Sequence, residues 1–176
     1  MSAQDLFFDF MFEGVGSVLL GAFVNISKRT YYSLILIPLL VILPHIFAWK
    51  RTRAHLNPAV SLANLLRRDV DYNILEFLVY IAAQSAGFFG GMYIVWWLER
   101  SVGDLNIKKD SSGQEQYHEA VFMEIAGSLI YVLVHLLSTH PKTYLSSNWG
   151  INAIVVSCFY GSLIEWGRNY TGGSFN

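Results

Sequence analysis

Cysteine and charged residues are scarce in this sequence. Cys158 is the one cysteine, and Asp, Glu, Lys and Arg together account for 14% of the residues, with a net charge of −1. A single thiol excludes a disulfide framework and a thiolate metal site within the chain. The low charge also leaves no basic surface interleaved with aromatic residues, so we expect no nucleic-acid partner.

Catalytic and ligand-binding patterns are missing from the sequence as well. His118-Glu119 lacks the second histidine of a zinc-binding helix motif, and His135 and His140 have no partners at the spacing of metal ligands. There is no glycine-rich phosphate loop. The sequence therefore predicts neither an enzyme nor a resident cofactor or metal ion.

Apolar residues are abundant instead. They make up 53% of the chain, aromatic residues make up 15%, and the mean hydropathy is +0.38. A membrane-spanning helix needs roughly 20 predominantly apolar residues. The sequence therefore predicts an all-α integral membrane protein in contact with the lipid bilayer. Five stretches come near the required length: 6–26, 31–49, 74–98, 120–137 and 149–166.

Basic residues concentrate between the second and third apolar stretches. Cytoplasmic loops carry an excess of Lys and Arg, so this loop and the N-terminus are predicted to face the cytoplasm or its equivalent. The first residues lack the basic region of a signal peptide, and we expect the first stretch to stay as a helix. No organelle address is evident, which leaves the plasma membrane and organelle membranes, including the mitochondrial inner membrane, as alternatives. The basic residues of the loop are Lys50, Arg51, Arg53, Arg67 and Arg68.

Two short patterns recur in the two halves of the chain. Glu-x-x-Gly-Ser occurs at residues 13–17 and again at 124–128, and the last residues, 171–176, resemble the segment that leads to Asn57. Two repeats around a central site are typical of channels and transporters. The predicted division is one transmembrane domain, 1–176, made of a first repeat (about 1–98), a polar linker (99–117) and an incomplete second repeat (118–176).

Asn57-Pro58-Ala59 begins an apolar segment that is too short to cross a membrane. Asparagine before a helix and proline in its first turn favour a helix start, so a half-helix is predicted over 58–66. Such a half-helix enters a membrane only where its non-helical end is buried in protein or lines a wet cavity. Two of them meeting end to end would place asparagine donors and positive helix ends at the centre of a narrow pore, orienting water and repelling cations.

At these residues the chain resembles the aquaporin, or major intrinsic protein, family. The matching segments are residues 54–63, the two Glu-x-x-Gly-Ser patterns, residues 80–87 and residues 170–176. The resemblance implies the family's inverted repeat of transmembrane helices with re-entrant half-helices, here five spans and the first half-helix. It also implies a passive channel for water or a small neutral solute such as glycerol, assembled as a homotetramer or with other membrane subunits.

The resemblance also assigns roles to single residues. Glu13 and Glu124 match the family's buried glutamates, which brace the re-entrant loops. A carboxylate without a partner in a membrane span is costly, so we expect each to accept hydrogen bonds from a re-entrant segment. The pore motif would comprise Asn57, Pro58, Ala59 and Asn176.

The family's selectivity constriction lies on its second and fifth spans and in its second re-entrant loop. Counting back without gaps from the two asparagines places Ile37 and Ile164 at the constriction, and Gly173 would be the third member. Isoleucine offers no hydrogen-bond donor. Such a ring would therefore suit a broader, less water-selective passage.

Three features depart from the family pattern. Arg53 stands where the family usually has glycine, whose backbone freedom arginine lacks. Pro38 and Pro44 lie in the second span, where each removes a helix hydrogen bond. In the family, the second half-helix and a sixth span follow the position of Asn176.

Three interpretations fit this last departure. The gene product is longer than the sequence, a separate chain supplies the missing part, or the chain is a degenerate, non-conducting structural subunit of a larger membrane assembly. In the last case we expect Arg53 to occlude the pore mouth or to pair across it.

Overall fold

The computed structural model describes residues 2–27, 33–102, 107–173 and 175 of the chain. These residues form helices and no strand, apart from one isolated bridge between Lys109 and Glu115. The prediction of an all-α fold is therefore confirmed. The helices are α1 (Ala3–Ser27), α2 (Ser33–Thr52), α3 (Pro58–Leu66), α4 (Ile74–Glu99), α5 (Tyr117–Thr139) and α6 (Trp149–Thr171).

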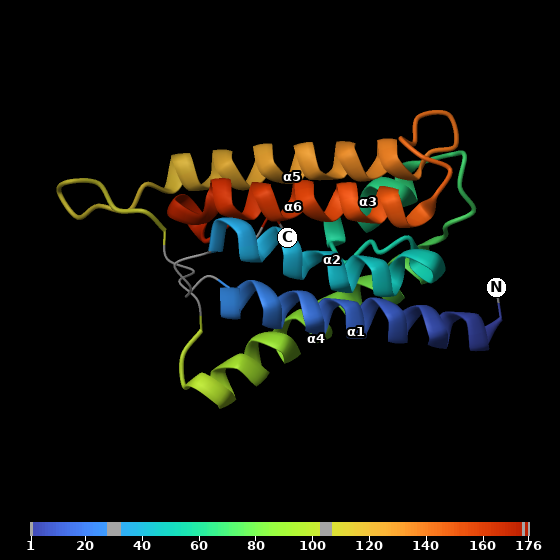
Figure 1. Ribbon diagram of the computed structural model, residues 1–176, viewed down its shortest axis with the longest axis horizontal. Coiled ribbons are helices and arrows are strands. Elements are labelled where there is room, and N and C mark those ends of the chain that lie inside the picture. Colours follow the sequence, from blue (N-terminus) through green and yellow to red (C-terminus); the bar gives the residue numbers. More distant parts are fainter. Residues whose placement is uncertain (1, 28–32, 103–106, 174, 176) are drawn as a thin grey trace.

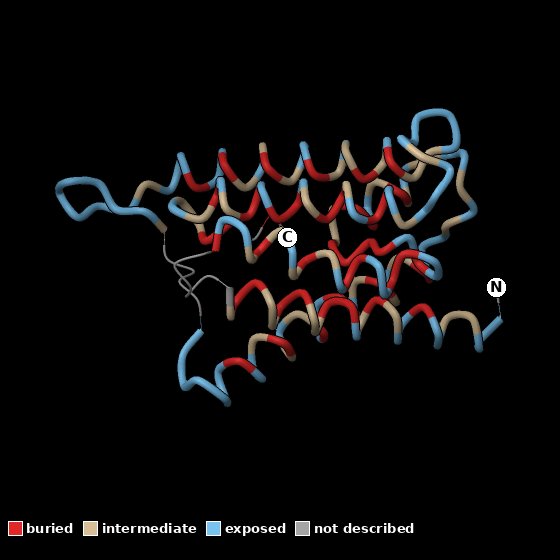
Figure 2. Tube along the Cα trace, viewed as in Figure 1, coloured by how far each residue is buried: buried red, intermediate tan, exposed pale blue. Residues whose placement is uncertain are grey.

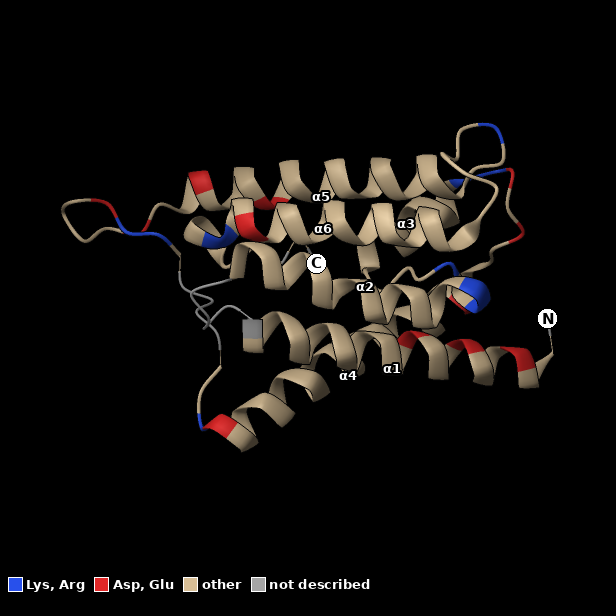
Figure 3. Cartoon of the chain, in the orientation of Figure 1, with Lys and Arg blue, Asp and Glu red and all other residues tan. Residues whose placement is uncertain are grey.

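Helices α1, α2, α4 and α5 are long and apolar enough to cross a membrane. Exposed Leu34, Phe89 and Leu129 face outward, as expected of side chains that contact lipid tails. Lys and Arg gather at the ends of the long helices and in the loops (Figure 3). The chain is an integral membrane protein.

The fifth predicted span, α6, differs from the other four. It is as long as α5, 23 residues, but less apolar, and it is not among the helices that composition marks as spans. It packs against both α2 and α5, so polar groups such as Asn152 and Ser157 are buried inside the protein. Burial by neighbouring helices explains how a less apolar helix can lie within the bundle.

Small residues bring α1 and α4 into close contact. A Cβ atom added at Gly87 would lie 2.3 Å from the carbonyl oxygen of Gly14, and one added at Gly91 would lie 2.2 Å from that of Val18. Only glycine permits backbones to approach so closely. These glycines therefore serve helix packing.

Helix α2 lies against α1 and α6, and α6 lies in turn against α5 (Figure 1). Helix α2 continues as one helix through Pro38 and Pro44. Its proline face packs tightly on α6, since a Cβ atom added at Gly161 would lie 2.4 Å from Pro38 Cα. Buried residues follow the inward faces of the long helices (Figure 2). The short helix α3 packs between α4 and α5.

The connection from α2 to α3 is turned by residues in the left-handed region of backbone space. The φ angles are 58° at Arg53, 49° at Ala54 and 47° at Leu56. Conformations of this kind persist in non-glycine residues only where the surroundings hold them. The expectation that arginine cannot adopt the glycine geometry at position 53 is therefore wrong, because Arg53 takes that geometry here.

Candidate functional site

Asn57 lies at the start of α3 and uses both ends of its side-chain amide. Its Oδ1 accepts a hydrogen bond from the Ala59 N–H at 2.7 Å, which caps the helix. Its Nδ2 donates to the carbonyl oxygen of Phe175 at 2.5 Å. The half-helix over 58–66 and its asparagine cap are thus confirmed, and the cap contacts the last part of the chain. Asn176 itself lies outside the described residues.

Glu13 of α1 holds the connection between α2 and α3, which we call the first loop. This fully buried carboxylate accepts from the N–H groups of His55 at 3.0 Å and Leu56 at 2.7 Å. It also accepts from the Thr52 hydroxyl and from Gln84 Nε2, the latter at 2.8 Å. Four donors to one carboxylate satisfy its lone pairs and offset the cost of its burial.

Glu124 of α5 makes the same kind of contact with the segment after α6, which we call the second loop. It accepts from the Thr171 hydroxyl and, at 2.8 Å, from the N–H of Phe175. The Thr171 hydroxyl in turn accepts from the N–H of Gly173 at 3.2 Å. In the first loop the Thr52 hydroxyl accepts from the N–H two residues later, also at 3.2 Å. The two loops are therefore built by the same arrangement.

The three residues assigned to the constriction lie in the packed interior. Ile37 and Ile164 are fully buried and belong to one apolar cluster. Gly173 has a φ of 66°, and a Cβ atom added there would lie 2.1 Å from the carbonyl oxygen of Ile164. The structure thus brings Gly173 against Ile164, and the two isoleucines leave no surface that a water molecule can touch.

Three ring side chains from three helices meet here, and two of them, Tyr131 and Tyr160, belong to the same cluster. Tyr131 of α5 stacks on Tyr160 of α6 with 4.2 Å between ring centroids and 26° between ring planes. The Tyr131 hydroxyl lies 3.1 Å from Nε2 of His45 on α2. The side chains of Tyr160 and Asn57 also interact. Tyr131 and His45 are fully buried and Tyr160 is 1% exposed, so the space between these helices is dry.

Further rings extend this contact toward the end of the bundle where α2 ends. His135 lies 6.2 Å from Tyr131 and 5.8 Å from His55, and His55 lies 5.0 Å from Tyr80, measured between centroids. We call the five rings, Tyr80, His55, His135, Tyr131 and Tyr160, the aromatic row. It runs without a gap from Tyr80 to the partner of Asn57.

Sequence reasoning missed the aromatic row. His135 has no partner at metal-ligand spacing in the sequence, yet the rings of Trp49 on α2 and His55 in the first loop lie 5.7 and 5.8 Å from it. The signal that could have indicated the row is local. Tyr131 and His135 are four residues apart and so share one face of an apolar helix, where polar rings need interior partners.

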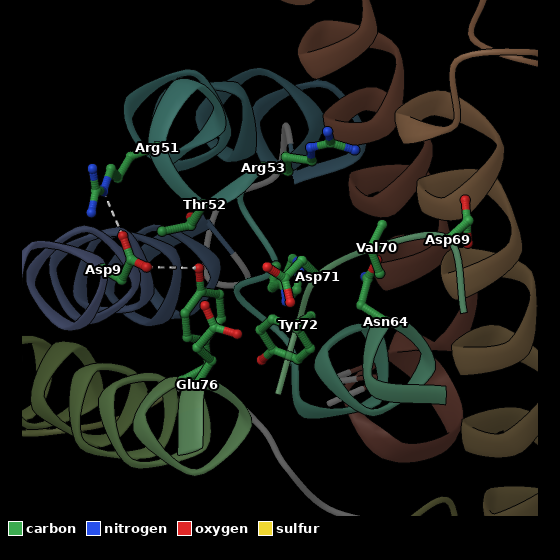
Figure 4. Close-up of a pocket in the computed structure, with 12 residues that line it drawn as sticks. Asp9, Arg51, Thr52, Arg53, Asn64, Asp69, Val70, Asp71, Tyr72 and Glu76 are labelled. Atoms are coloured by element: carbon green, nitrogen blue, oxygen red, sulfur yellow. Dashed lines mark hydrogen bonds and ion pairs between the residues drawn. The ribbon is translucent and has the colours of Figure 1, made fainter. Parts of the chain in front are cut away.

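A polar cavity of about 390 Å³ lies at the outer end of the row (Figure 4). Asp9, Arg51, Glu76 and Tyr80 are among the residues that line it. Arg51 Nε donates to Asp9 Oδ1 at 2.5 Å, and the Tyr80 hydroxyl lies 3.5 Å from the other oxygen of Asp9. The cavity is therefore charged at its rim and leads to the rings of the row.

Arg53 and the loop after α3 complete the wall of the polar cavity. Arg53 Nη1 donates to the carbonyl oxygen of Thr139 at the end of α5, at 2.9 Å, which ties the first loop to α5. The Arg67 guanidinium, 2.6 Å from Asp69, lowers the pKa of Asp69 to about 2. Asp69 is thus a carboxylate at neutral pH, and the rim keeps charges of both signs.

Comparison with protein families gives one match that covers almost the whole chain. The model of the family described as major intrinsic protein matches residues 10–176. Comparison with curated proteins gives no match.

Proposed function

Because the chain belongs to the major intrinsic protein family, whose members are channels for water or small solutes rather than enzymes, we propose that it is a passive channel for water or a small neutral solute such as glycerol. The meeting of the two loops at Asn57 supports this function most directly. Asn57 Nδ2 donates to the carbonyl oxygen of Phe175, the residue before Asn176. Two asparagines at such a meeting point would supply the donors that orient a passing water.

In this proposal Asn57, Pro58, Ala59 and Asn176 form the pore motif. The positive end of α3, which begins at Pro58, disfavours cations there. Glu13 and Glu124 brace the loops and take no part in proton transfer. The contacts of both carboxylates with loop N–H groups support that role.

The proposed constriction is formed by Ile37, Ile164 and Gly173. Its two isoleucine side chains are apolar, so the ring discriminates by size rather than by hydrogen bonding. A small neutral solute with a carbon skeleton suits such a ring better than an ion does. The packing of Gly173 against Ile164 supports the placing of these two residues together.

Osmotic shrinkage of lipid vesicles tests the proposed function. Vesicles containing the purified full chain are mixed with a hyperosmotic solution of sucrose or of glycerol, and light scattering follows their volume. We expect faster water efflux than from empty vesicles. A pH-sensitive dye trapped in the vesicles should show no proton leak. Rates equal to those of empty vesicles, from protein shown to be folded, would reject passive conduction by the wild-type chain.

A second function is favoured by the dry interior. Tyr131, His45 and Tyr160 fill the space between α2, α5 and α6. A chain filled in this way would serve as a non-conducting structural subunit of a larger membrane assembly. That function predicts no water flux and purification together with other membrane subunits, whereas the channel function predicts flux from the chain alone, as a homotetramer.

A further inference from the structure

We propose that Tyr131 is the plug of this channel: its ring closes the path between the polar cavity and Asn57, and its size sets the permeability of the protein. This inference rests on the proposed function, because it presumes that a path exists once the ring is out of the way. It adds a residue outside the pore motif and outside the proposed constriction. Three observations support it. They are the central position of the Tyr131 ring, its hydrogen bond to His45, and the buried Nδ1 of His135, which has no hydrogen-bond partner among the described residues.

The position of Tyr131 is central. The ring comes from α5 and is enclosed by His45 from α2 and Tyr160 from α6. Its 4.2 Å centroid separation from Tyr160 is shorter than the separations found elsewhere along the aromatic row. With Tyr131 fully buried, no water molecule fits between these helices. The path is therefore closed at this level.

The attachment of Tyr131 is a single directed hydrogen bond. His45 Nδ1 lies 2.9 Å from the carbonyl oxygen of Val41, which can only accept, so the proton of a neutral His45 is on Nδ1. His45 Nε2 is then an acceptor, and the Tyr131 hydroxyl donates to it at 3.1 Å. A bond between two side chains can break without unfolding any helix. Rotation of Tyr131 is thus a local event.

Three of the other four rings of the row are tied to the loops. His55 is part of the first loop, the side chain of Tyr160 interacts with that of Asn57, and His135 Nε2 contacts the carbonyl oxygen of Arg53 at 2.9 Å. Removing any of them would disturb the loops as well as the path. Tyr131 bonds to His45 instead, so it is the ring whose removal tests closure with the least disturbance of the loops.

The unsatisfied neighbour is Nδ1 of His135. Because its Nε2 donates to the Arg53 carbonyl oxygen, Nδ1 is a bare acceptor. It is buried and has no hydrogen-bond partner among the described residues. A buried acceptor without a donor is unfavourable, and a water molecule arriving from the polar cavity would satisfy it. The open conformation therefore gains a hydrogen bond from water to His135 that the closed conformation lacks. A difference of this kind between two conformations is what shifts their populations.

The test compares osmotic shrinkage of vesicles that contain equal amounts of folded wild-type protein, Tyr131→Ala or Leu20→Ala. Leu20 is a matched control, since it is fully buried in the same apolar core but lies on α1, outside the aromatic row. We expect a severalfold rise in water permeability for Tyr131→Ala and no rise for Leu20→Ala. Tyr131→Leu keeps more of the core packing and is expected to fold where the alanine variant does not. Its permeability should lie between those of wild type and Tyr131→Ala.

The outcome separates the plug from the proposed function. If the wild type conducts and neither Tyr131 variant is faster, the plug is overturned while the channel stands. If the wild type equals empty vesicles and the Tyr131 variants conduct, the plug is supported and the wild type is a closed or structural protein. If no variant exceeds empty vesicles, or if Leu20→Ala rises as much as Tyr131→Ala, the plug is overturned.

Discussion

The first loop at Arg53 has a φ of 58°, and the second loop at the corresponding residue, Gly172, has a φ of 81°. The next pair, Ala54 and Gly173, has φ angles of 49° and 66°. One loop thus reaches a left-handed backbone with glycine, for which that region is readily accessible, and the other reaches it without glycine. The backbone path of the loop is evidently the property that both repeats keep.

The carboxylate contacts show how the first loop manages without glycine. Left-handed conformations cost roughly 1 to 2 kcal/mol per non-glycine residue. Leu56 and Phe175, the third pair, have φ angles of 47° and 45°, and the N–H of each donates to a glutamate at 2.7 and 2.8 Å. Buried Glu13 binds four donors around the first loop, and those bonds offset the strain that Arg53 and Ala54 introduce.

Removing the Glu13 carboxylate should have the largest effect on the first loop. In Glu13→Leu the four donors lose their acceptor, at about 1 to 3 kcal/mol for each donor left without a partner. We expect thermal unfolding in detergent, followed by tryptophan fluorescence, to occur at a much lower temperature than in wild type. Glu13→Gln keeps one acceptor oxygen and should lose less. A Glu13→Leu protein as stable as wild type would show that the first loop does not depend on this carboxylate.

Adding a methyl group at Gly173 should be nearly as damaging. Gly173→Ala places a side chain at a φ of 66° and 2.1 Å from the carbonyl oxygen of Ile164. Left-handed strain and overpacking together give a loss of roughly 2 to 5 kcal/mol. Gly90→Ala is the control, because a Cβ atom there meets only Val18 Cγ2 at 3.8 Å. Equal melting temperatures for the two variants would contradict the role of Gly173.

The two loop threonines offer a direct test of equivalence between the loops. Thr52→Val and Thr171→Val each remove a hydroxyl that donates to a glutamate and accepts from a backbone N–H. Each variant should lose about 2 kcal/mol, since a hydrogen bond to a charged group contributes roughly 1.5 to 3 kcal/mol. The measurement is chemical denaturation in mixed detergent micelles. Losses that differ severalfold between the two loops would mean that they are not built alike.

The smallest effect concerns Arg53. Comparing Arg53→Gly with Arg53→Ala isolates the backbone, because both variants lose the contact of the side chain with the Thr139 carbonyl oxygen. We expect the glycine variant to be the more stable by about 1 kcal/mol, since it removes left-handed strain. Denaturation curves of the two variants under one condition provide the comparison. If the alanine variant is as stable as the glycine variant or more stable, backbone strain does not distinguish the first loop from the second.

The sequence alone located much of this architecture. Asn57 and Pro58 predicted the start of α3 because capping and proline placement are local effects that neighbouring helices do not change. The repeated Glu-x-x-Gly-Ser pattern indicated that Glu13 and Glu124 would occupy related places. Long apolar stretches predicted the helices of the bundle for an equally local reason, the cost of polar groups in lipid.

The interior could not be predicted in the same way. His45, Tyr131 and Tyr160 come from three different helices, and no spacing in the sequence relates residues that meet only after the helices pack. The limited hydropathy of α6 has a similar explanation, because its polar residues are sheltered by α2 and α5 rather than by its own composition. The left-handed backbone at Arg53 could not be predicted from residue preference, because it depends on the hydrogen bonds that the first loop donates to Glu13.

The four hydrogen bonds that Glu13 accepts affect how a loop of this kind is recognised in a sequence. A search pattern that requires glycine at the turn would pass over the first loop, where Arg53 and Ala54 occupy the left-handed positions. The Glu13 carboxylate on α1 marks this loop where glycine is missing, because it binds the loop N–H groups while the turn itself holds arginine and alanine. A chain without glycine at the turn can therefore still form this loop.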